Sequence, residues 1–278
     1  MTYMTSADDG ARRSAATSPR PDEPAGEGLA VRREDGVLWL VLDRPAQRNA
    51  LSIAVRRGLV RALRSADDDP DTRVVVVTGR DPAFSSGVDL TESIGPDGRS
   101  PRGARTDPAA VVRATRTPVV AAINGACYTG ALELALSCSF VIASERATFA
   151  DTHAQVGLLP GWGQTALLPR AVGVRMARQM LLTGEPVDAA TALRVGLVTE
   201  VVPHEQLLDR AAVLAAAIAA ASPAAAAASL ELLSVGDGLG TAHALGLEAE
   251  AGLRWRSDPA EVQRRFRAQT GRREKSTQ

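Results

Sequence analysis

The chain has 278 residues, a length that suits one large domain or one domain with a smaller helical appendage. Hydrophobic residues make up 45% and charged residues 23%, which is typical of a globular protein with a real core. Lysine plus arginine and aspartate plus glutamate number 32 each, so the net charge is zero and no nucleic-acid partner is expected.

The sequence also lacks the patterns that are typical of membrane, secreted and metal-binding proteins. The most apolar stretch, residues 211–228, is mostly alanine and is broken by Ser222 and Pro223, so we expect helices and no membrane span. The first residues show no basic-then-apolar signal pattern, which predicts a cytoplasmic protein. Cys127 and Cys138 lack metal-ligand spacing and are expected to be reduced core residues, with no metal bound.

The first third of the chain predicts strands alternating with a helix. Residues 1–27 contain almost no large apolar side chain and are expected to be a disordered tail. Residues 37–42 predict a strand, Ser52 is a candidate cap for a helix over 53–65, and 73–78 predict a buried β-branched strand.

The middle of the chain continues this alternation. Residues 91–107 are rich in Gly, Pro, Ser and Asp and predict a long loop that shapes the substrate pocket. Strands are expected at 118–123 and 140–143, with a helix starting near Gly130. This order predicts an α/β core over residues 28–202.

After residue 202 no strand-like run remains, and alanine, leucine and glutamate dominate. Residues 203–278 therefore predict a C-terminal helical subdomain. Asp258 followed by Pro259 and Glu261 has the pattern of a capped helix start, and residues 264–273 are locally basic.

Two strand-to-helix connections could carry chemistry. In residues 82–90, small side chains allow a ligand to approach the backbone closely, and free N–H groups there could stabilise an oxyanion, although an ordinary turn has the same composition. In residues 123–135, Gly130 offers an unpaired N–H at a helix start. Glu133 follows among apolar residues, where a carboxylate could act as a base or simply stabilise the helix N-terminus.

A third segment, residues 147–163, contains His153, one of three histidines, and Asp151 as a second polar candidate. Residues 161–166 match the dinucleotide pattern GxGxxA, but no clear strand precedes them and Trp162 is poorly suited to a phosphate turn, so we discount this match and expect Trp162 to pack. Walker A, HExxH and GxSxG motifs are absent from the sequence.

Taken in order, these segments resemble the enoyl-CoA hydratase/isomerase family, also called the crotonase superfamily. The resemblance covers about residues 37–202 and weakens in the helical tail. The segments that carry it most clearly are Asp43-Arg44-Pro45, Ala83-Phe84-Ser85-Ser86-Gly87-Val88-Asp89-Leu90, Asn124-Gly125, Gly130-Ala131-Leu132-Glu133-Leu134-Ala135, Phe149-Ala150-Asp151 and Gly157-Leu158-Leu159-Pro160-Gly161.

The resemblance implies an α/β crotonase-like fold of stacked ββα units with a C-terminal helical trimerisation region, in trimers or dimers of trimers. It implies an acyl-CoA substrate without a separate cofactor, a role in fatty acid β-oxidation, and an oxyanion hole formed by the N–H groups of Ser86 and Gly130. It places the coenzyme A part of the substrate along two segments, with the basic helix near 264–267 as a candidate for its phosphates, from a neighbouring subunit. The residues of the two segments are Gln47, Arg48, Ala50, Ser85, Ser86, Gly87, Val88 and Asp89.

Hydratases of this family use two glutamates, and the second position is His153 here. We expect Glu133 to activate the water that adds to the β-carbon of an enoyl-CoA, and His153 to supply the α-carbon proton or to orient the water. The alternatives are an isomerase or thioester hydrolase on the same scaffold, and a non-catalytic acyl-CoA binder.

Overall fold

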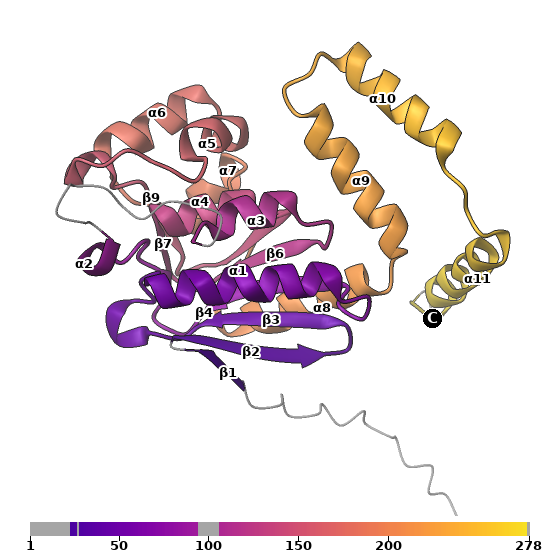
Figure 1. Ribbon diagram of the computed structural model, residues 1–278, viewed down its shortest axis with the longest axis horizontal. Helices are drawn as coiled ribbons and strands as arrows, with labels where there is room; N and C mark the ends of the chain where they lie inside the picture. Colours follow the sequence, from indigo (N-terminus) through magenta and orange to yellow (C-terminus); the bar gives the residue numbers. More distant parts are fainter. Residues whose placement is uncertain (1–22, 27, 94–105, 277–278) are drawn as a thin grey trace, which may run out of the picture.

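The computed structural model describes residues 23–26, 28–93 and 106–276. Within these residues the strands form a larger and a smaller sheet (Figure 1). The larger sheet has the order β1-β2-β3-β4-β6-β8-β11 and the smaller has the order β10-β9-β7-β5. In chain order the strands are β1 (Glu23–Gly26), β2 (Leu29–Glu34), β3 (Val37–Leu42), β4 (Val74–Gly79), β5 (Ala83–Ser85), β6 (Val119–Ile123), β7 (Ala126–Tyr128), β8 (Phe140–Ser144), β9 (Thr148–Ala150), β10 (Val187–Asp188) and β11 (Glu200–Val202).

Helices connect these strands and then form the C-terminal part of the chain. The α-helices are α1 (Ile53–Asp68), α2 (Leu90–Ser93), α3 (Pro108–Ala114), α4 (Gly130–Ser137), α5 (Gln164–Val172), α6 (Val174–Thr183), α7 (Ala189–Arg194), α8 (Leu207–Ala219), α9 (Pro223–Gly236), α10 (Thr241–Arg254) and α11 (Pro259–Ser276). Three short 3-10 helices are η1 (Pro45–Gln47), η2 (Ala154–Val156) and η3 (His204–Gln206).

From β4 to β9 the strands come in successive pairs, and each pair is divided between the two sheets. β4, β6 and β8 lie parallel in the larger sheet, whereas β5, β7 and β9 lie parallel in the smaller one. A helix follows each pair, so the chain repeats a ββα unit, as the fold prediction stated. The turns after β5 and β7 consequently lie close together, and this is where the candidate site forms.

Both faces of the larger sheet are buried, which explains the nearly pure β-branched strands. In β3 and β4, alternate residues such as Leu38 and Val75 pack into the main core with α1, while Trp39 and Val76 pack on the other face. The helix α1 begins where expected, because the Ser52 hydroxyl oxygen accepts the N–H of Val55 at 3.2 Å. It continues to Asp68, three residues beyond the predicted end.

The second face of the sheet is covered by α8. Its residues Leu207, Ala211 and Ala215 are fully buried in the cluster that contains Trp39 and Val76. The helix α8 therefore belongs to the core, and the helices that stand apart begin at α9 (Figure 1), later than the expected boundary at residue 203. The cause is the alanine-rich face of α8, which fits closely against a sheet.

The N-terminal prediction also needs correction. Residues 1–22 and 27 of the expected disordered tail lie outside the described residues, but Glu23–Gly26 form β1 and pair antiparallel with β2. Residues 94–105, most of the long loop expected at 91–107, lie outside the described residues too. Its ends form α2 and the cap of α3, where the Asp107 carboxylate accepts the N–H of Ala110 at 2.8 Å.

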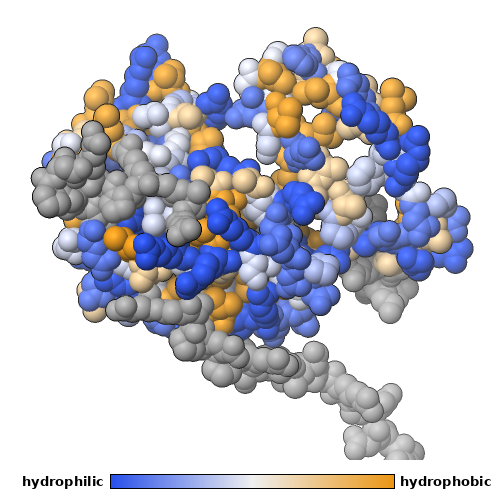
Figure 2. Space-filling view, viewed as in Figure 1, coloured by the Kyte–Doolittle hydropathy of each residue, from blue (hydrophilic) through white to orange (hydrophobic). Residues whose placement is uncertain are grey.

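The helices α9, α10 and α11 form an arm that extends from the core (Figure 1). The residues of α9 and α10 are not buried, and Figure 2 shows hydrophobic side chains over these helices. The exposed large hydrophobic residues of the arm are Leu233, Val235, Leu239, Leu245, Leu253, Trp255, Val262 and Phe266. In the described chain no single helix is long and apolar enough to cross a membrane. The helical segments 204–219 and 223–236 together have the length and composition of a membrane span, but they are bent by 103° relative to each other.

Both cysteines are free thiols, as expected for reduced residues. Cys127 in β7 is fully buried in the main core, and Cys138 follows α4. Burial raises the pKa of the Cys138 thiol to about 12 and that of Cys127 well above its usual value, so neither is a reactive thiolate.

Candidate active site

Glu133 lies in the first turn of α4 and its side chain is only 2% exposed. One carboxylate oxygen, Oε1, accepts three backbone N–H groups, from Gly161 at 3.1 Å, Trp162 at 2.6 Å and Gln164 at 3.2 Å. Burial raises the pKa of Glu133, while the hydrogen bonds from Trp162 and Gln164 oppose the rise. The second oxygen, Oε2, is left for chemistry, and the raised pKa suits an acid–base group.

The backbone N–H groups of the segment that matches GxGxxA therefore bind a side chain of the protein itself, that of Glu133. The helix α5 begins at Gln164, and the N–H groups before and at its start hold the Glu133 carboxylate, as helix N-termini hold anions. Because these N–H groups already bind the Glu133 carboxylate, they are not available to the phosphate of a dinucleotide, in agreement with the decision to discount the GxGxxA match. Trp162 is 7% exposed and packs in the main core, as expected.

His153 faces this carboxylate from the segment after β9. Its Nε2 lies 3.8 Å from Glu133 Oε2, too far for a direct hydrogen bond and close enough for both groups to contact one small molecule. Its Nδ1 lies 2.8 Å from Asp151 Oδ1. The structure thus brings Glu133 and His153 together, as predicted. It also places Asp151 against the His153 ring, a contact that the Asp-x-His spacing in the sequence could have suggested.

The backbone N–H of Ser86 is occupied. It donates to the carbonyl oxygen of Arg48 at 2.9 Å. This hydrogen bond contradicts the prediction of Ser86 as an oxyanion donor, because an N–H already paired with a carbonyl is unavailable to a substrate. Sequence reasoning missed the pairing because Arg48 lies 38 residues away in a turn with a left-handed backbone (φ 48°).

The free N–H in this segment is that of Val88, two residues later. Among the described residues neither Val88 nor Gly130 has a hydrogen-bond acceptor for its backbone N–H. The two residues are adjacent, since a Cβ built on Gly130 would lie 3.5 Å from the Val88 nitrogen and 2.9 Å from its Cγ2. Val88 and Gly130 therefore form a pair of free donors at the start of α4.

Gly87 and Thr129 hold these two donors together. Gly87 has φ 97°, and a Cβ there would overlap the Thr129 hydroxyl oxygen, so only glycine fits. Thr129 itself has φ 50°, unusual for a β-branched residue, and its N–H donates to Ala150 at 2.9 Å. The close contact of the two turns fixes the spacing between Val88 and Gly130.

The two segments predicted to bind coenzyme A lie side by side. Leu51 N–H donates to the Gly87 carbonyl at 2.8 Å, and Asp89 N–H donates to the Leu51 carbonyl at 3.2 Å. Gln47 and Arg48 are exposed and Ala50 is half-buried beside them. Ser85 is fully buried, and its hydroxyl accepts the Gly87 N–H at 3.1 Å, so its side chain supports the turn.

Asp89 is paired with Arg44 through a 2.9 Å contact between Oδ2 and Nη1. Hydrogen bonds from Thr91, together with Arg44, lower the pKa of Asp89. Its carboxylate thus stays charged and fixes the turn. The basic residues 264–267 lie on α11, at the opposite end of the molecule from α2 (Figure 1). Because α2 begins directly after Asp89, these residues do not meet this site within one chain.

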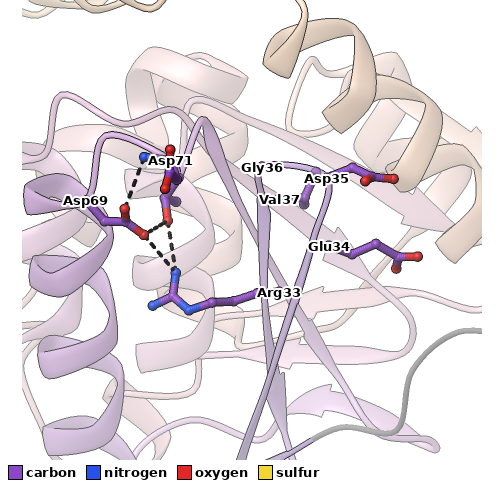
Figure 3. Close-up of a pocket in the computed structure, with 8 residues that line it drawn as sticks. Arg33, Glu34, Asp35, Gly36, Val37, Asp69 and Asp71 are labelled. Carbon is purple, nitrogen blue, oxygen red and sulfur yellow. Dashed lines mark hydrogen bonds and ion pairs between the residues drawn. The ribbon is translucent and has the colours of Figure 1, made fainter.

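A separate cavity of ≈ 380 Å³ lies at the turn between β2 and β3 (Figure 3). Arg33 Nη1 donates there to Thr72 Oγ1 at 2.9 Å and to Asp69 Oδ2 at 3.2 Å, which ties the turn to the loop after α1. None of the candidate site residues lines it. Within the described ranges, no group of three or more His, Cys, Asp or Glu side chains could hold a metal ion.

Comparisons with known proteins agree with this geometry. A family model described as "Enoyl-CoA hydratase/isomerase" matches residues 32–251. A probable peroxisomal enoyl-CoA hydratase 1 from Arabidopsis thaliana is 35% identical, covering 82% of this chain and 87% of that protein. A 2,3-dehydroadipyl-CoA hydratase from Escherichia coli (strain K12) is 39% identical, covering 68% and 74%.

Solved structures show the same likeness. The crystal structure of an enoyl-CoA hydratase from Mycobacterium avium is 47% identical, with a TM-score of 0.68, and covers 82% of this chain and 96% of that one. The match to the family model extends over most of the chain, through both sheets and into the arm. The chain therefore belongs to the enoyl-CoA hydratase/isomerase family.

Proposed function

We propose that the protein is an enoyl-CoA hydratase, which adds water across the 2,3-double bond of an enoyl-CoA thioester. The observation that carries the proposal is the 3.8 Å separation between Glu133 Oε2 and His153 Nε2, close to the free N–H groups of Val88 and Gly130. Relatives named as enoyl-CoA and dehydroadipyl-CoA hydratases support it. Adding water to a double bond is neither an oxidation nor a reduction, so the reaction needs no redox cofactor, and coenzyme A enters only as part of the substrate.

The Val88 and Gly130 N–H groups bind the thioester carbonyl oxygen in this proposal. Addition at the β-carbon turns the thioester into an enolate, whose oxygen carries a negative charge. Fixed donors stabilise this charge more strongly than they stabilise the neutral carbonyl, so they lower the barrier. Gly130 also contributes the positive end of the α4 dipole.

Glu133 and His153 divide the proton transfers. A water held between them loses a proton to Glu133 Oε2 as its oxygen bonds to the β-carbon. The imidazolium of His153 then gives its Nε2 proton to the α-carbon of the enolate. Glu133 then returns its proton to His153 through a water bound between them, because the 3.8 Å gap is too long for a direct hydrogen bond. Both groups are restored, and one water has been added to the substrate.

The coenzyme A part of the substrate lies along the paired segments 47–50 and 85–89 in this proposal. Their backbones are fixed by the Leu51–Gly87 and Asp89–Leu51 hydrogen bonds, which supports a preformed groove. The residues 264–267 of α11 contact the phosphates only if they come from a neighbouring subunit, because α11 lies far from this groove in its own chain.

We also propose a homotrimer, or a dimer of trimers. The support is the arm, whose side chains Leu233, Leu245, Leu253 and Phe266 are between 61% and 78% exposed in the single chain. Such a set of exposed apolar side chains marks an interaction surface. A role in fatty acid β-oxidation fits the proposed reaction, and the two free thiols support a reducing compartment such as the cytoplasm.

The test follows the absorbance of the conjugated enoyl thioester when purified protein is mixed with crotonyl-CoA and with a longer enoyl-CoA. Turnover in the parent protein, with loss in both Glu133→Gln and His153→Ala, is the expected result. A parent protein that binds acyl-CoA but turns over neither substrate would rule out the hydratase.

His153 also favours a second candidate, because this position departs from the two glutamates of hydratases that the family resemblance implies. An isomerase or thioester hydrolase would use the same oxyanion donors. Product identification after incubation with 3-enoyl-CoA and with saturated acyl-CoA separates these activities from hydration. A non-catalytic binder would bind acyl-CoA unchanged and would not require Glu133.

A further inference from the structure

Asp151 is fully buried and is joined to His153 by two contacts. Its Oδ1 accepts the backbone N–H of His153 at 2.9 Å and lies 2.8 Å from the ring nitrogen Nδ1. Its Oδ2 is buried without a hydrogen-bond partner in the described part of the chain. Burying a carboxylate is costly unless its charge is paired or hydrogen-bonded, and the contacts with His153 are the ones that offset this cost. A buried aspartate held at this cost beside a candidate catalytic histidine points to a role in the site.

The two contacts decide which ring nitrogen carries the proton. An ionised carboxylate only accepts hydrogen bonds, so Nδ1 must be protonated to pair with it. The other nitrogen, Nε2, then points toward Glu133 Oε2 and is the one that can gain or lose a proton.

We infer that Asp151 is a positioning residue that fixes the ring and tautomer of His153, so that the proton moves only between Glu133 and His153 Nε2. The inference rests on the proposed hydratase reaction for its kinetic consequence. The tautomer itself can be measured without turnover.

The charges around His153 agree with this role. Glu133 faces it from α4 and Asp151 faces it from its own segment after β9, and both are carboxylates. Among the described residues neither carboxylate forms an ion pair with an arginine or lysine. After His153 has donated its proton to carbon, the Nδ1–H kept by Asp151 leaves the lone pair on Nε2, ready for the proton held by Glu133.

The first test is direct observation of the tautomer. The protein has three histidines, so nitrogen-15 NMR of histidine-labelled protein resolves them, and His153→Gln assigns the signal of interest. The neutral ring of His153 is expected to carry its proton on Nδ1 in the parent protein. A proton on Nε2 in the parent would overturn the inference even if no Asp151 variant folds.

The second test compares two matched aspartate–histidine pairs. Asp151→Asn places an amide beside Nδ1 and is expected to shift the neutral ring toward Nε2–H. Asp81→Asn is the control, because Asp81 Oδ2 lies 3.0 Å from His204 Nε2 in a pair that does not contact Glu133. Asp81→Asn should leave the His153 signal unchanged, and an equal effect of both variants would contradict the inference.

The third test asks whether Asp151 acts through His153. Asp151→Asn is expected to lower kcat by about 10²-fold or more, with little change in KM, because a wrong tautomer impairs proton transfer. In a His153→Gln background, Asp151→Asn should cause no further loss.

The outcomes separate this inference from the proposed function. The same loss from Asp151→Asn with and without His153 would show a structural role only and overturn the inference. If the parent protein hydrates no enoyl-CoA, the proposed function fails. An Nδ1–H tautomer that Asp151→Asn abolishes would still support the positioning role in that case.

Discussion

The backbone N–H of Ser86 donates to the carbonyl oxygen of Arg48 across 2.9 Å. This single hydrogen bond joins the two segments that border the proposed coenzyme A groove. It also removes Ser86 from the set of free donors, and the next outward-facing N–H in the turn, that of Val88, lies beside Gly130. The donor pair proposed for the thioester oxygen is thus decided by a contact between residues 38 positions apart.

Replacing the backbone amide by an ester tests this donor directly. Substituting the α-hydroxy acid analogue of valine at position 88 replaces the N–H by an oxygen and keeps the side chain. We expect kcat to fall by about 10²–10³-fold, the cost of one oxyanion donor. The same change at Ser86 removes only the hydrogen bond to Arg48 and should affect stability more than kcat. A larger kcat loss at Ser86 than at Val88 would restore the original assignment.

Gly130→Ala should close the same site from the other side. The new Cβ would lie 2.9 Å from Val88 Cγ2 and 3.3 Å from Trp162 Cζ3, in a fully packed region. We expect kcat/KM to fall by about 10²-fold or more with the fold retained. Gly246→Ala in α10 is the matched control, because its Cβ would contact nothing within 4 Å. Steady-state kinetics on crotonyl-CoA and circular dichroism measure both, and full activity of Gly130→Ala would refute the donor site.

Glu133→Gln is expected to lower the activity and to raise the stability of the folded protein at neutral pH. The glutamine can still accept the three N–H groups on its oxygen but cannot take a proton from water, so activity should fall by about 10²–10⁴-fold. Acyl-CoA binding, measured by calorimetry, should be retained.

The stability effect has a defined pH dependence. Burial raises the pKa of Glu133 in the folded state, so the protonated form is favoured by folding. This contribution is present below the unfolded-state pKa and is lost as the pH rises through the raised folded-state pKa. Thermal unfolding should therefore show Glu133→Gln to be more stable than the parent at neutral pH, with a smaller difference near pH 4. A difference that does not depend on pH would contradict this origin.

His153→Glu restores the glutamate implied by the family resemblance, but we expect it to be a poor hydratase alone. The new carboxylate would lie near the buried Asp151, and repulsion would keep a proton on one of the two. Adding Asp151→Asn removes this charge, so the double variant should exceed His153→Glu by about tenfold or more in kcat. Equal rates for the two variants would show that Asp151 does not influence position 153.

The arm should determine the oligomeric state. Leu253→Asp and Phe266→Asp place charges on side chains that are 78% and 66% exposed in one chain, and we expect both to convert trimers into monomers. Gln263→Asp adds a charge at an exposed polar position of α11 and serves as the control. Light scattering coupled to size exclusion measures the mass. A monomeric parent protein would refute the trimer.

The local elements of this protein are readable from its sequence. The strand Val37–Leu42, the Ser52 cap and the helix start at Asp258 follow from β-branched runs and capping residues, whose preferences act over a few positions. The sequence also placed Gly130 and Glu133 at a helix start and identified His153 as a candidate, since each depends on its immediate neighbours.

Tertiary structure decided what depends on distant contacts. It placed α8 on the sheet, paired Ser86 with Arg48 and left Val88 as the free donor, and it surrounded the Glu133 carboxylate with the N–H groups of Gly161, Trp162 and Gln164. A backbone N–H looks the same at every position of a sequence. Whether it is free or occupied is settled only when the chain folds and a remote carbonyl or carboxylate reaches it.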